Sequence, residues 1–394
     1  MKDLSEANAA KTPGYVLPLI VASQFCGTSL WFASNGVMDA LTDNFGLPET
    51  ALGSLTAAVQ FGFIAGTLVF AVLTLADRFS PSRVFFFSAL LGALANLGLV
   101  WEGNGYPTLL LLRFATGFFL AGIYPVGMKI ASDYYNKGLG TSLGYLVGAL
   151  VLGTAFPHLL GSGLLSFSWQ WVLAITSMMA AAGGLAVYFL PDGPYSSRMQ
   201  QLDLTAFFSV FRKPSFRGAA FGYFGHMWEL YAFWAFVPRI LQTYGHGHIN
   251  ASFTLSFWSF LIIGIGGPAC VLGGYLSRHW GPRKVAGTSL LLSGLCCLLL
   301  PFSLKWAFPF FATFMLFWGM VVIADSPLFS TLVAQNASSE KKGTALTIVT
   351  CIGFAITIVS IELLTLGIPL MDSPWVYSLL AAGPVFGLLG MRRP

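Results

Sequence analysis

The chain contains few charged residues for its length. Asp, Glu, Lys and Arg together make up 9% of its 394 residues, whereas apolar residues make up 56% and the mean hydropathy is +0.75. Soluble domains carry roughly 25% charged residues. An ordinary water-exposed surface is therefore excluded, and we expect lipid to be the solvent around most of the chain.

The sequence also lacks the motifs of several classes of enzyme and pump. No Gly-rich phosphate-binding loop ending in Lys-Ser or Lys-Thr is present, which excludes coupling to ATP through that motif. The run from His246 to His248 is the only hint of a metal-ligating cluster, and three loop positions do not supply the polar cluster that a membrane enzyme needs. We therefore predict that the protein is not an enzyme and that it holds no cofactor or metal.

Cysteines are few, and no pair of them has metal-ligand spacing. We interpret them as packing residues of apolar segments; they are Cys26, Cys270, Cys296, Cys297 and Cys351. The formal net charge is +5, but no basic run with interleaved aromatic residues is present. The positive charge therefore reflects membrane topology, and we expect no nucleic-acid partner.

Long apolar runs dominate what is present. A helix of about 20 apolar residues crosses the roughly 30 Å core of a bilayer. Twelve such runs can be placed, near residues 16–40, 51–75, 84–101, 108–131, 140–165, 169–190, 216–242, 251–277, 285–304, 306–334, 343–366 and 375–390. The sequence thus predicts an all-α integral membrane protein with twelve transmembrane helices. We expect prolines within these runs to kink helices and not to end them; they are Pro18, Pro125, Pro157, Pro268 and Pro327.

The distribution of basic residues predicts the orientation. Apart from Arg113, Arg239 and Lys305, every Lys and Arg falls on one side of the predicted spans. The positive-inside rule places that side, and with it both termini, in the cytoplasm. We expect a multi-pass protein of the bacterial inner (plasma) membrane.

A repeated loop divides the chain into two similar parts. TLADRFSPSRV ends at Val84, and GYLSRHWGPRKV ends at Val285, 201 positions later. The stretch that begins at Phe25 also aligns without gaps on the stretch that begins at Phe224. We predict six-helix halves at 1–190 and 216–394, joined by a cytoplasmic linker at 191–215. Parallel repeats of this kind place a solute site at their interface.

The two loops resemble the major facilitator superfamily, and the resemblance extends over essentially the whole chain. Asp77 and Arg78 match the Asp-Arg pair of the loop between helices 2 and 3, whereas Leu73 and Ser80 replace its two glycines. The resemblance implies twelve helices in two pseudo-symmetric halves and a latch on the cytoplasmic side. The candidate latch residues are Asp77, Arg78 and Arg83, with Arg278, Arg283 and Lys284 in the second copy. The alternative is that Asp77 only caps a helix.

The fourth predicted helix carries a second motif of the same family. RFATGFFLA fits the pattern Arg-x-x-x-Gly-x-x-x-Ala at Arg113, Gly117 and Ala121. An Arg inside an apolar helix costs several kcal/mol unless it is paired or faces water. The resemblance implies proton transfer or contact with an anion for Arg113; the alternative is an ion pair that only locks helices together.

Other ionisable residues also fall inside apolar runs. Glu229 lies near the middle of the seventh helix, where burial favours the neutral carboxyl, and it is the first candidate for a proton carrier. His226 is close enough along the helix to share its face. Asp325, just before Pro327, is a further candidate, although a helix-packing hydrogen bond explains it equally well.

Polar and aromatic residues on the first and seventh helices predict the substrate cavity. Trp31, Asn35 and Asp39 repeat every four residues and would share one helix face. The remaining candidates are Arg113, His158, Trp228, Tyr231, Trp234 and Glu362. Such a lining suits an amphipathic or planar solute; the alternative is that these aromatic residues face lipid or pack helices together.

Small residues at intervals of four predict close helix packing. We expect two such ladders to form sliding surfaces between the halves; they are Ala58, Gly62 and Gly66, and Gly140, Gly144 and Gly148.

Together these features predict a proton-coupled secondary transporter that moves a small organic solute by alternating access and is a monomer. Arg113 with His158 favours an organic anion. Two alternatives stay open: a proton-linked antiporter that exports drugs or metabolites, and a membrane sensor that binds a solute without transporting it. The fifth helix lacks the Gly-Pro pair common in antiporters of the family, which weakens the first alternative.

Overall fold

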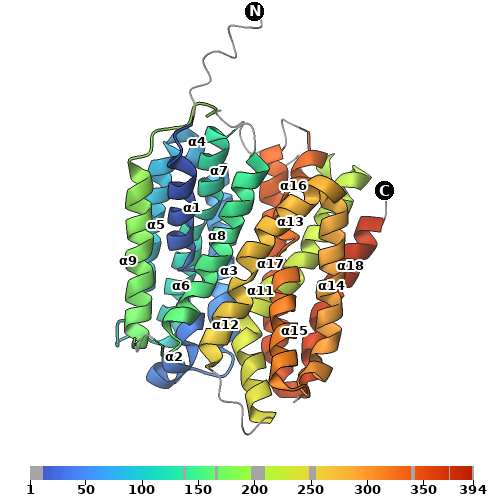
Figure 1. Ribbon diagram of the computed structural model, residues 1–394. Coiled ribbons are helices and arrows are strands. Elements are labelled where there is room, and N and C mark those ends of the chain that lie inside the picture. The colour runs from blue at the N-terminus through green and yellow to red at the C-terminus, as the bar shows by residue number, and fades with distance from the viewer. Residues whose placement is uncertain are drawn as a thin grey trace, which may run out of the picture.

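The computed structural model describes residues 12–135, 139–164, 167–196, 209–247, 254–338, 342–371 and 373–392. Within these ranges the regular structure is helical and contains no strand. The helices run roughly side by side (Figure 1). Those before residue 190, blue to green, occupy one side of the molecule, and those after 214, yellow to red, the other.

The first group of helices ends before the predicted linker. It comprises α1 (Val16–Thr28), η1 (Asn35–Val37), α2 (Met38–Phe45), α3 (Ala51–Val72), α4 (Leu75–Arg78), α5 (Pro81–Gly98), α6 (Tyr106–Leu120), α7 (Tyr124–Tyr134), α8 (Leu139–Leu160) and α9 (Trp169–Tyr188).

The second group follows the linker, of which residues 197–208 lie outside the described ranges. It comprises α11 (Pro214–Gly247), α12 (Leu255–Gly264), α13 (Gly266–Trp280), α14 (Pro282–Ser303), α15 (Phe308–Val321), α16 (Ser326–Asn336), α17 (Lys342–Met371), η3 (Pro374–Ala381) and α18 (Ala382–Arg392).

Nine helices of the described ranges are long and apolar enough to cross a membrane. The predicted spans near residues 16–40, 84–101 and 216–242 are helical too, as α1, α5 and α11, but they are not among these nine. Length and apolarity therefore support a multi-pass membrane protein, while the count of twelve stays a prediction.

Several predicted spans consist of two helices in line. The first is interrupted at residues 29–34, and others at 121–123, 265 and 322–325. Pro125, Pro268 and Pro327 stand among the first three residues of a new helix, where a missing backbone N–H costs nothing. Each of these spans nevertheless continues past its proline, at Tyr106–Tyr134, Leu255–Trp280 and Phe308–Asn336, which agrees with the prediction that the prolines do not end them. Pro157 does lie inside α8.

Contacts between the two groups are made chiefly by α3 with α17 and by α8 with α12 and α13. Glycines permit this approach: a Cβ on Gly148 would lie 3.1 Å from the carbonyl oxygen of Gly267. Gly62 and Gly66, in contrast, pack on Phe114 and Phe118 of α6, within the first group. Of the two predicted ladders, the one on α3 therefore packs helices together within the first group. It does not form a sliding surface between the halves.

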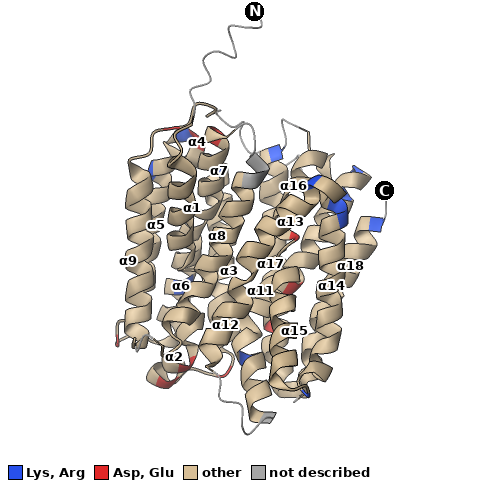
Figure 2. Cartoon of the chain, in the orientation of Figure 1, with Lys and Arg blue, Asp and Glu red and all other residues tan. Residues whose placement is uncertain are grey.

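Most basic residues lie at the end of the molecule that carries both termini (Figure 2). The opposite end carries acidic residues around α2. This asymmetry agrees with the charge pattern of the sequence. Some of the basic residues lie outside the described ranges, namely Lys2, Lys11, Lys137, Arg198, Lys341 and Arg393.

Candidate functional site

A cavity of about 590 Å³ lies between the two helix groups, at the end opposite the termini. One wall is formed by α2, the start of α3 and the end of α8, and the other by the second half of α11 with parts of α12 and α17. Polar side chains line both walls: Asn35, Asp39, Glu49 and His158 on the first, and Arg239, Gln242, Ser256 and Thr365 on the second. A volume of this size suits a small organic molecule.

Aromatic rings from both groups close the cavity toward the termini. We call Trp31, Phe63, Tyr231 and Phe354 the aromatic plug. The Trp31 ring stacks on Phe354 with centroids 5.7 Å apart, and its centroid lies 5.6 Å from that of Tyr231 and 4.8 Å from that of Phe63. Along each of their helices these residues lie nearer the termini than the cavity lining does. The plug therefore separates the cavity from the end that carries the basic residues.

Of the nine predicted cavity residues, Asn35, Asp39 and His158 line the cavity. The Asn35 amide donates to Thr56 Oγ1 at 2.9 Å, and Asp39 is exposed. His158 is 1% exposed, and its Nε2 has no hydrogen-bond partner among the described residues. This nitrogen is therefore a buried polar atom that the described residues leave unsatisfied.

Trp31, Asn35 and Asp39 do not share one helix face as expected. The helix that would align them is interrupted between Thr28 and Asn35, and Trp31 turns into the plug, where its Nε1 donates to Gln60 Oε1 at 3.3 Å. Period-four spacing orients side chains together only along an unbroken helix.

The other predicted cavity residues lie away from the lining. Trp228 donates its Nε1 to the Leu379 carbonyl oxygen at 3.1 Å, inside the second group. Tyr231 belongs to the plug, and Trp234 is buried against Phe32 and Tyr231. Glu362 is partly buried on α17.

Arg113 is fully buried beside the interruption of the first span. Its guanidinium donates to the carbonyl oxygens of Leu30, at 3.1 Å, and of Trp31, and it also contacts Asn96 Oδ1 at 3.5 Å. Carbonyl groups past a helix end lack intrahelical partners. Arg113 supplies donors to them and does not line the cavity.

Glu229 points away from the cavity, into the second group. Its Oε1 accepts from Trp318 Nε1 at 2.7 Å, from Cys297 Sγ at 3.3 Å and from Ser293 Oγ. The carboxyl group is 1% exposed and links α11 to α14 and α15. A single carboxylate thus holds three helices of one group.

His226 and Asp325 form a second buried contact on α11. His226 Nδ1 lies 2.8 Å from Asp325 Oδ1, and both side chains are 1% exposed. Asp325 precedes α16 directly, at the break between α15 and α16. The structure thus brings His226 to Asp325, although the sequence grouped it with Glu229.

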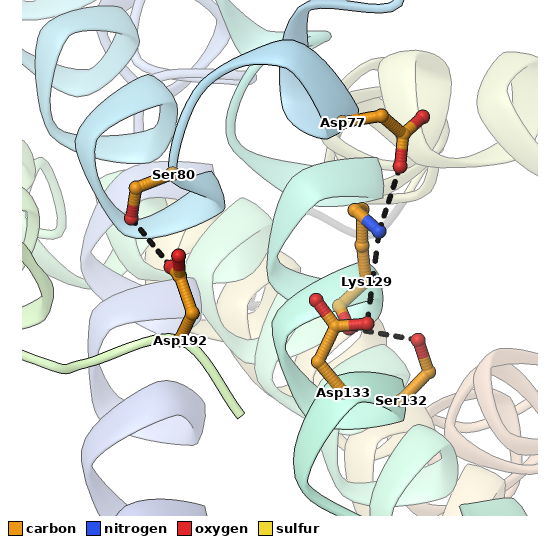
Figure 3. Close-up of polar contacts among 6 residues, drawn as sticks. All are labelled: Asp77, Ser80, Lys129, Ser132, Asp133 and Asp192. Carbon is orange, nitrogen blue, oxygen red and sulfur yellow. Dashed lines mark hydrogen bonds and ion pairs between the residues drawn. The ribbon is translucent and has the colours of Figure 1, made fainter. Parts of the chain in front are cut away.

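The repeated loops make different contacts at the other end of the molecule. Asp77 lies 2.9 Å from Lys129 Nζ, which is also 3.6 Å from Asp133 (Figure 3). Ser80 Oγ donates to Asp192 at 2.6 Å nearby. Asp77 therefore bonds a neighbouring helix, α7, and is not only a cap. Lys129 and Asp133 were not among the predicted latch residues, although their spacing of four on one helix is a recognisable signal.

The remaining loop residues make other contacts. Arg283 donates to the Met391 carbonyl oxygen, and the Arg278 guanidinium lies 4.9 Å from the centroid of the Tyr275 ring. The Arg78 guanidinium lies 5.9 Å from the centroid of the Phe79 ring. Arg83 and Lys284 are exposed.

Arg239 lines the cavity but was not among the predicted cavity residues, and the same holds for Glu49, Gln242, Ser256 and Thr365. The sequence placed Arg239 in or beside an outer loop, at the end of the predicted span 216–242. In the structure α11 continues to Gly247, and Ala235, Arg239 and Gln242 follow each other along one face of it. The helical spacing of these residues was the available signal.

Comparison with known proteins agrees with this architecture. The sequence profile of the Major Facilitator Superfamily matches residues 20–361. The chain is 23% identical to the "Probable L-galactonate transporter" of Escherichia coli (strain K12), over 60% of this chain and 55% of that protein. It is 27% identical to the "4-hydroxybenzoate transporter PcaK" of Pseudomonas aeruginosa, over 41% and 36%. These matches span about half of each relative or less.

Solved structures match over nearly the whole chain. The nucleoside transporter NupG is similar with a TM-score of 0.74 at 15% identity, covering 96% of this chain and 99% of that one. A bacterial homologue of the human lysosomal transporter Spinster, inward-facing and unoccupied, is similar with a TM-score of 0.70 at 17% identity, covering 97% and 96%. At these identities the likeness concerns the fold. Profile and fold agree, and the chain belongs to the Major Facilitator Superfamily.

Proposed function

We propose that this protein is a secondary transporter that moves a small organic solute, preferentially an organic anion, together with protons by alternating access. The observation that carries the proposal is the cavity between the two helix groups, which has exposed polar residues at its mouth and the aromatic plug at its inner end. A cavity that is lined by both groups can close when one group moves relative to the other.

In this proposal residues 1–190 and 216–394 rock as two bodies about the contacts between α3 and α17 and between α8 and α13. The close approach of Gly148 to Gly267 supports a contact there that side chains do not obstruct. With the termini in the cytoplasm, the conformation described here faces outward. Opening inward would separate the rings of the plug.

Two features support an organic anion as solute. His158 offers an unpartnered nitrogen in the cavity lining. The two relatives named above carry L-galactonate and 4-hydroxybenzoate in their names, and both compounds are carboxylates.

Proton coupling is proposed to reside in the second group. Glu229 and the His226–Asp325 pair connect α11 to α14, α15 and the break before α16. A proton that binds to either changes the contacts that hold these helices and so biases which face is open.

The test of this function is accumulation of candidate organic anions in vesicles that contain the purified protein, with and without a pH gradient. Accumulation that requires the gradient supports the proposal. Binding without any turnover would identify a sensor, and transport of hydrophobic cations alone would identify a drug or metabolite antiporter.

The latch yields a further prediction. Asp77→Asn removes one partner of Lys129, and the loss of about 1 kcal/mol from one state shifts a two-state ratio about fivefold. We expect the variant to favour the inward-open state. The measurement is maleimide labelling of a cysteine at Thr67, which lies one helical turn from Phe63 toward the termini. Asp192→Asn, which removes a charge at the same end but no bond to Lys129, is the control. Equal labelling of the Asp77 variant and the parent protein would contradict the latch.

A further inference from the structure

The two walls of the cavity carry opposite charges. Arg239 stands on the α11 wall, whereas Asp39 and Glu49 stand on the wall formed by α2 and the start of α3. Among the described residues no N–O distance of 4.0 Å or less joins Arg239 to either acid. The three side chains thus line one space as separate charges.

Arg239 keeps most of its hydrogen-bonding capacity for a ligand. Its Nη1 donates to Gln242 Oε1 at 2.9 Å, which holds the guanidinium beside its own helix. A guanidinium has five N–H donors in a planar fork, and this shape matches a carboxylate. Arg113, by contrast, directs its donors to main-chain carbonyl groups and does not line the cavity.

The opposite wall offers complementary groups. Asp39 and Glu49 are acceptors when ionised, and hydroxyl groups donate well to carboxylates. His158 Nε2, buried and without a partner among the described residues, lies on the same wall and can bond one more polar group. A solute that satisfies both walls needs an anionic end and a hydroxylated end.

We infer that the cavity binds a hydroxylated monocarboxylate between its walls, with the carboxylate against Arg239 and hydroxyl groups against Asp39 and His158. This inference rests on the proposed transport function, which it makes specific. The acids on the α2 wall repel a second negative charge, so they select against dicarboxylates as well as binding hydroxyl groups.

The test uses solutes that differ by one group, measured by thermal stabilisation and calorimetric binding to the purified full-length protein. One set is 4-hydroxybenzoate, benzoate, phenol and terephthalate; the other is gluconate and sorbitol. A ligand that prefers the folded protein raises its unfolding midpoint. Within the first set we expect 4-hydroxybenzoate to bind at least about tenfold more tightly than benzoate, phenol or terephthalate. Alternatively, within the second set, gluconate binds at least about tenfold more tightly than sorbitol.

Variants assign the two ends of the ligand. Arg239→Gln should weaken binding of the hydroxycarboxylate about ten- to a hundredfold and remove its advantage over phenol or sorbitol, because the charge-assisted bonds are lost. Asp39→Asn should instead bring the affinity for 4-hydroxybenzoate closer to that for benzoate. It should also allow terephthalate to bind more tightly than it binds to the parent protein. Both residues are exposed, so folding should persist. Arg217→Gln, an exposed change near the start of α11, is the matched control.

Contrary outcomes are distinct. If no hydroxycarboxylate binds, or if the single-group partners bind equally well, the inference is wrong. The proposed function then still stands if another solute accumulates with the pH gradient. If hydroxycarboxylates bind in an Arg239-dependent way but none is transported, the inference holds and the proposed function fails.

Discussion

Replacing Glu229 with Gln is expected to abolish proton-driven accumulation of solute while leaving binding and exchange intact. The amide oxygen of Gln can accept the hydrogen bonds that Glu229 accepts from Trp318 and Ser293, so the three helices stay connected. The amide cannot take up a proton in the physiological range. This single substitution should therefore remove proton coupling without unfolding the protein.

The size of this effect follows from the driving force. With one proton coupled per solute, a gradient of one pH unit supports about a tenfold solute gradient, since 1.4 kcal/mol corresponds to a factor of ten. We expect the wild-type protein to approach this ratio and Glu229→Gln to stop at equal concentrations inside and outside. The measurement is uptake into vesicles with an imposed pH gradient, compared with exchange of labelled for unlabelled solute.

Glu102→Gln is the matched control, because Glu102 is an exposed carboxylate in the turn before α6. It should accumulate solute as the wild-type protein does. Accumulation at the wild-type level by Glu229→Gln would remove Glu229 from the coupling mechanism and leave the His226–Asp325 pair. Asp325→Asn would then be the informative variant.

Replacing Arg113 with Leu is expected to destabilise the protein by about 3 kcal/mol or more. The substitution leaves the carbonyl groups of Leu30 and Trp31 and the Asn96 side chain without their buried donor. Each buried polar group that loses its partner costs about 1–3 kcal/mol. Arg113→Lys retains the charge but not the forked geometry of the guanidinium. Its stability should therefore lie between that of the wild-type protein and that of Arg113→Leu.

The measurement is unfolding of the purified protein in detergent, with Arg217→Leu as the control. Arg217 is exposed, so its loss should leave the unfolding midpoint nearly unchanged. If Arg113→Leu keeps the wild-type midpoint but loses transport, Arg113 acts on solute or protons. Its main-chain bonds would then be incidental. This result distinguishes a role of Arg113 in transport from a role in holding the helices together.

The residues that line the cavity were only partly predictable. Asn35, Asp39 and His158 were expected in the lining and lie there, because each is a polar group in an apolar run and must avoid lipid. Arg239 was missed because it was considered only as a basic residue near the outer loop, although it lies within the predicted span 216–242 and within α11. Hydropathy locates the segment in the membrane but does not show which of its side chains face the cavity.

Directions of side chains were predicted less well than positions. Glu229 was predicted as a proton carrier in the middle of the seventh helix, but the partners of its carboxylate on α14 and α15 were not predicted. Aromatic residues occur on several faces of α11, and their pattern does not show which helix packs against each face. Likewise, Gly62 and Gly66 indicated a close helix approach without indicating that the partner is α6. The interrupted segment at residues 29–34 contains no proline, so this sequence signal of a helix break is missing there.

The sequence by itself determined that this is a helical membrane protein of the Major Facilitator Superfamily, with a repeated loop and an asymmetric distribution of charge. These properties depend on how each segment interacts with lipid and water, which composition and order fix locally. Only the tertiary structure decided that Arg113 bonds main-chain carbonyl groups, that Glu229 holds α14 and α15, and that Arg239 faces the acids across the cavity. The contacts of a polar side chain depend on which helices pack beside it, and those helices lie far away along the chain.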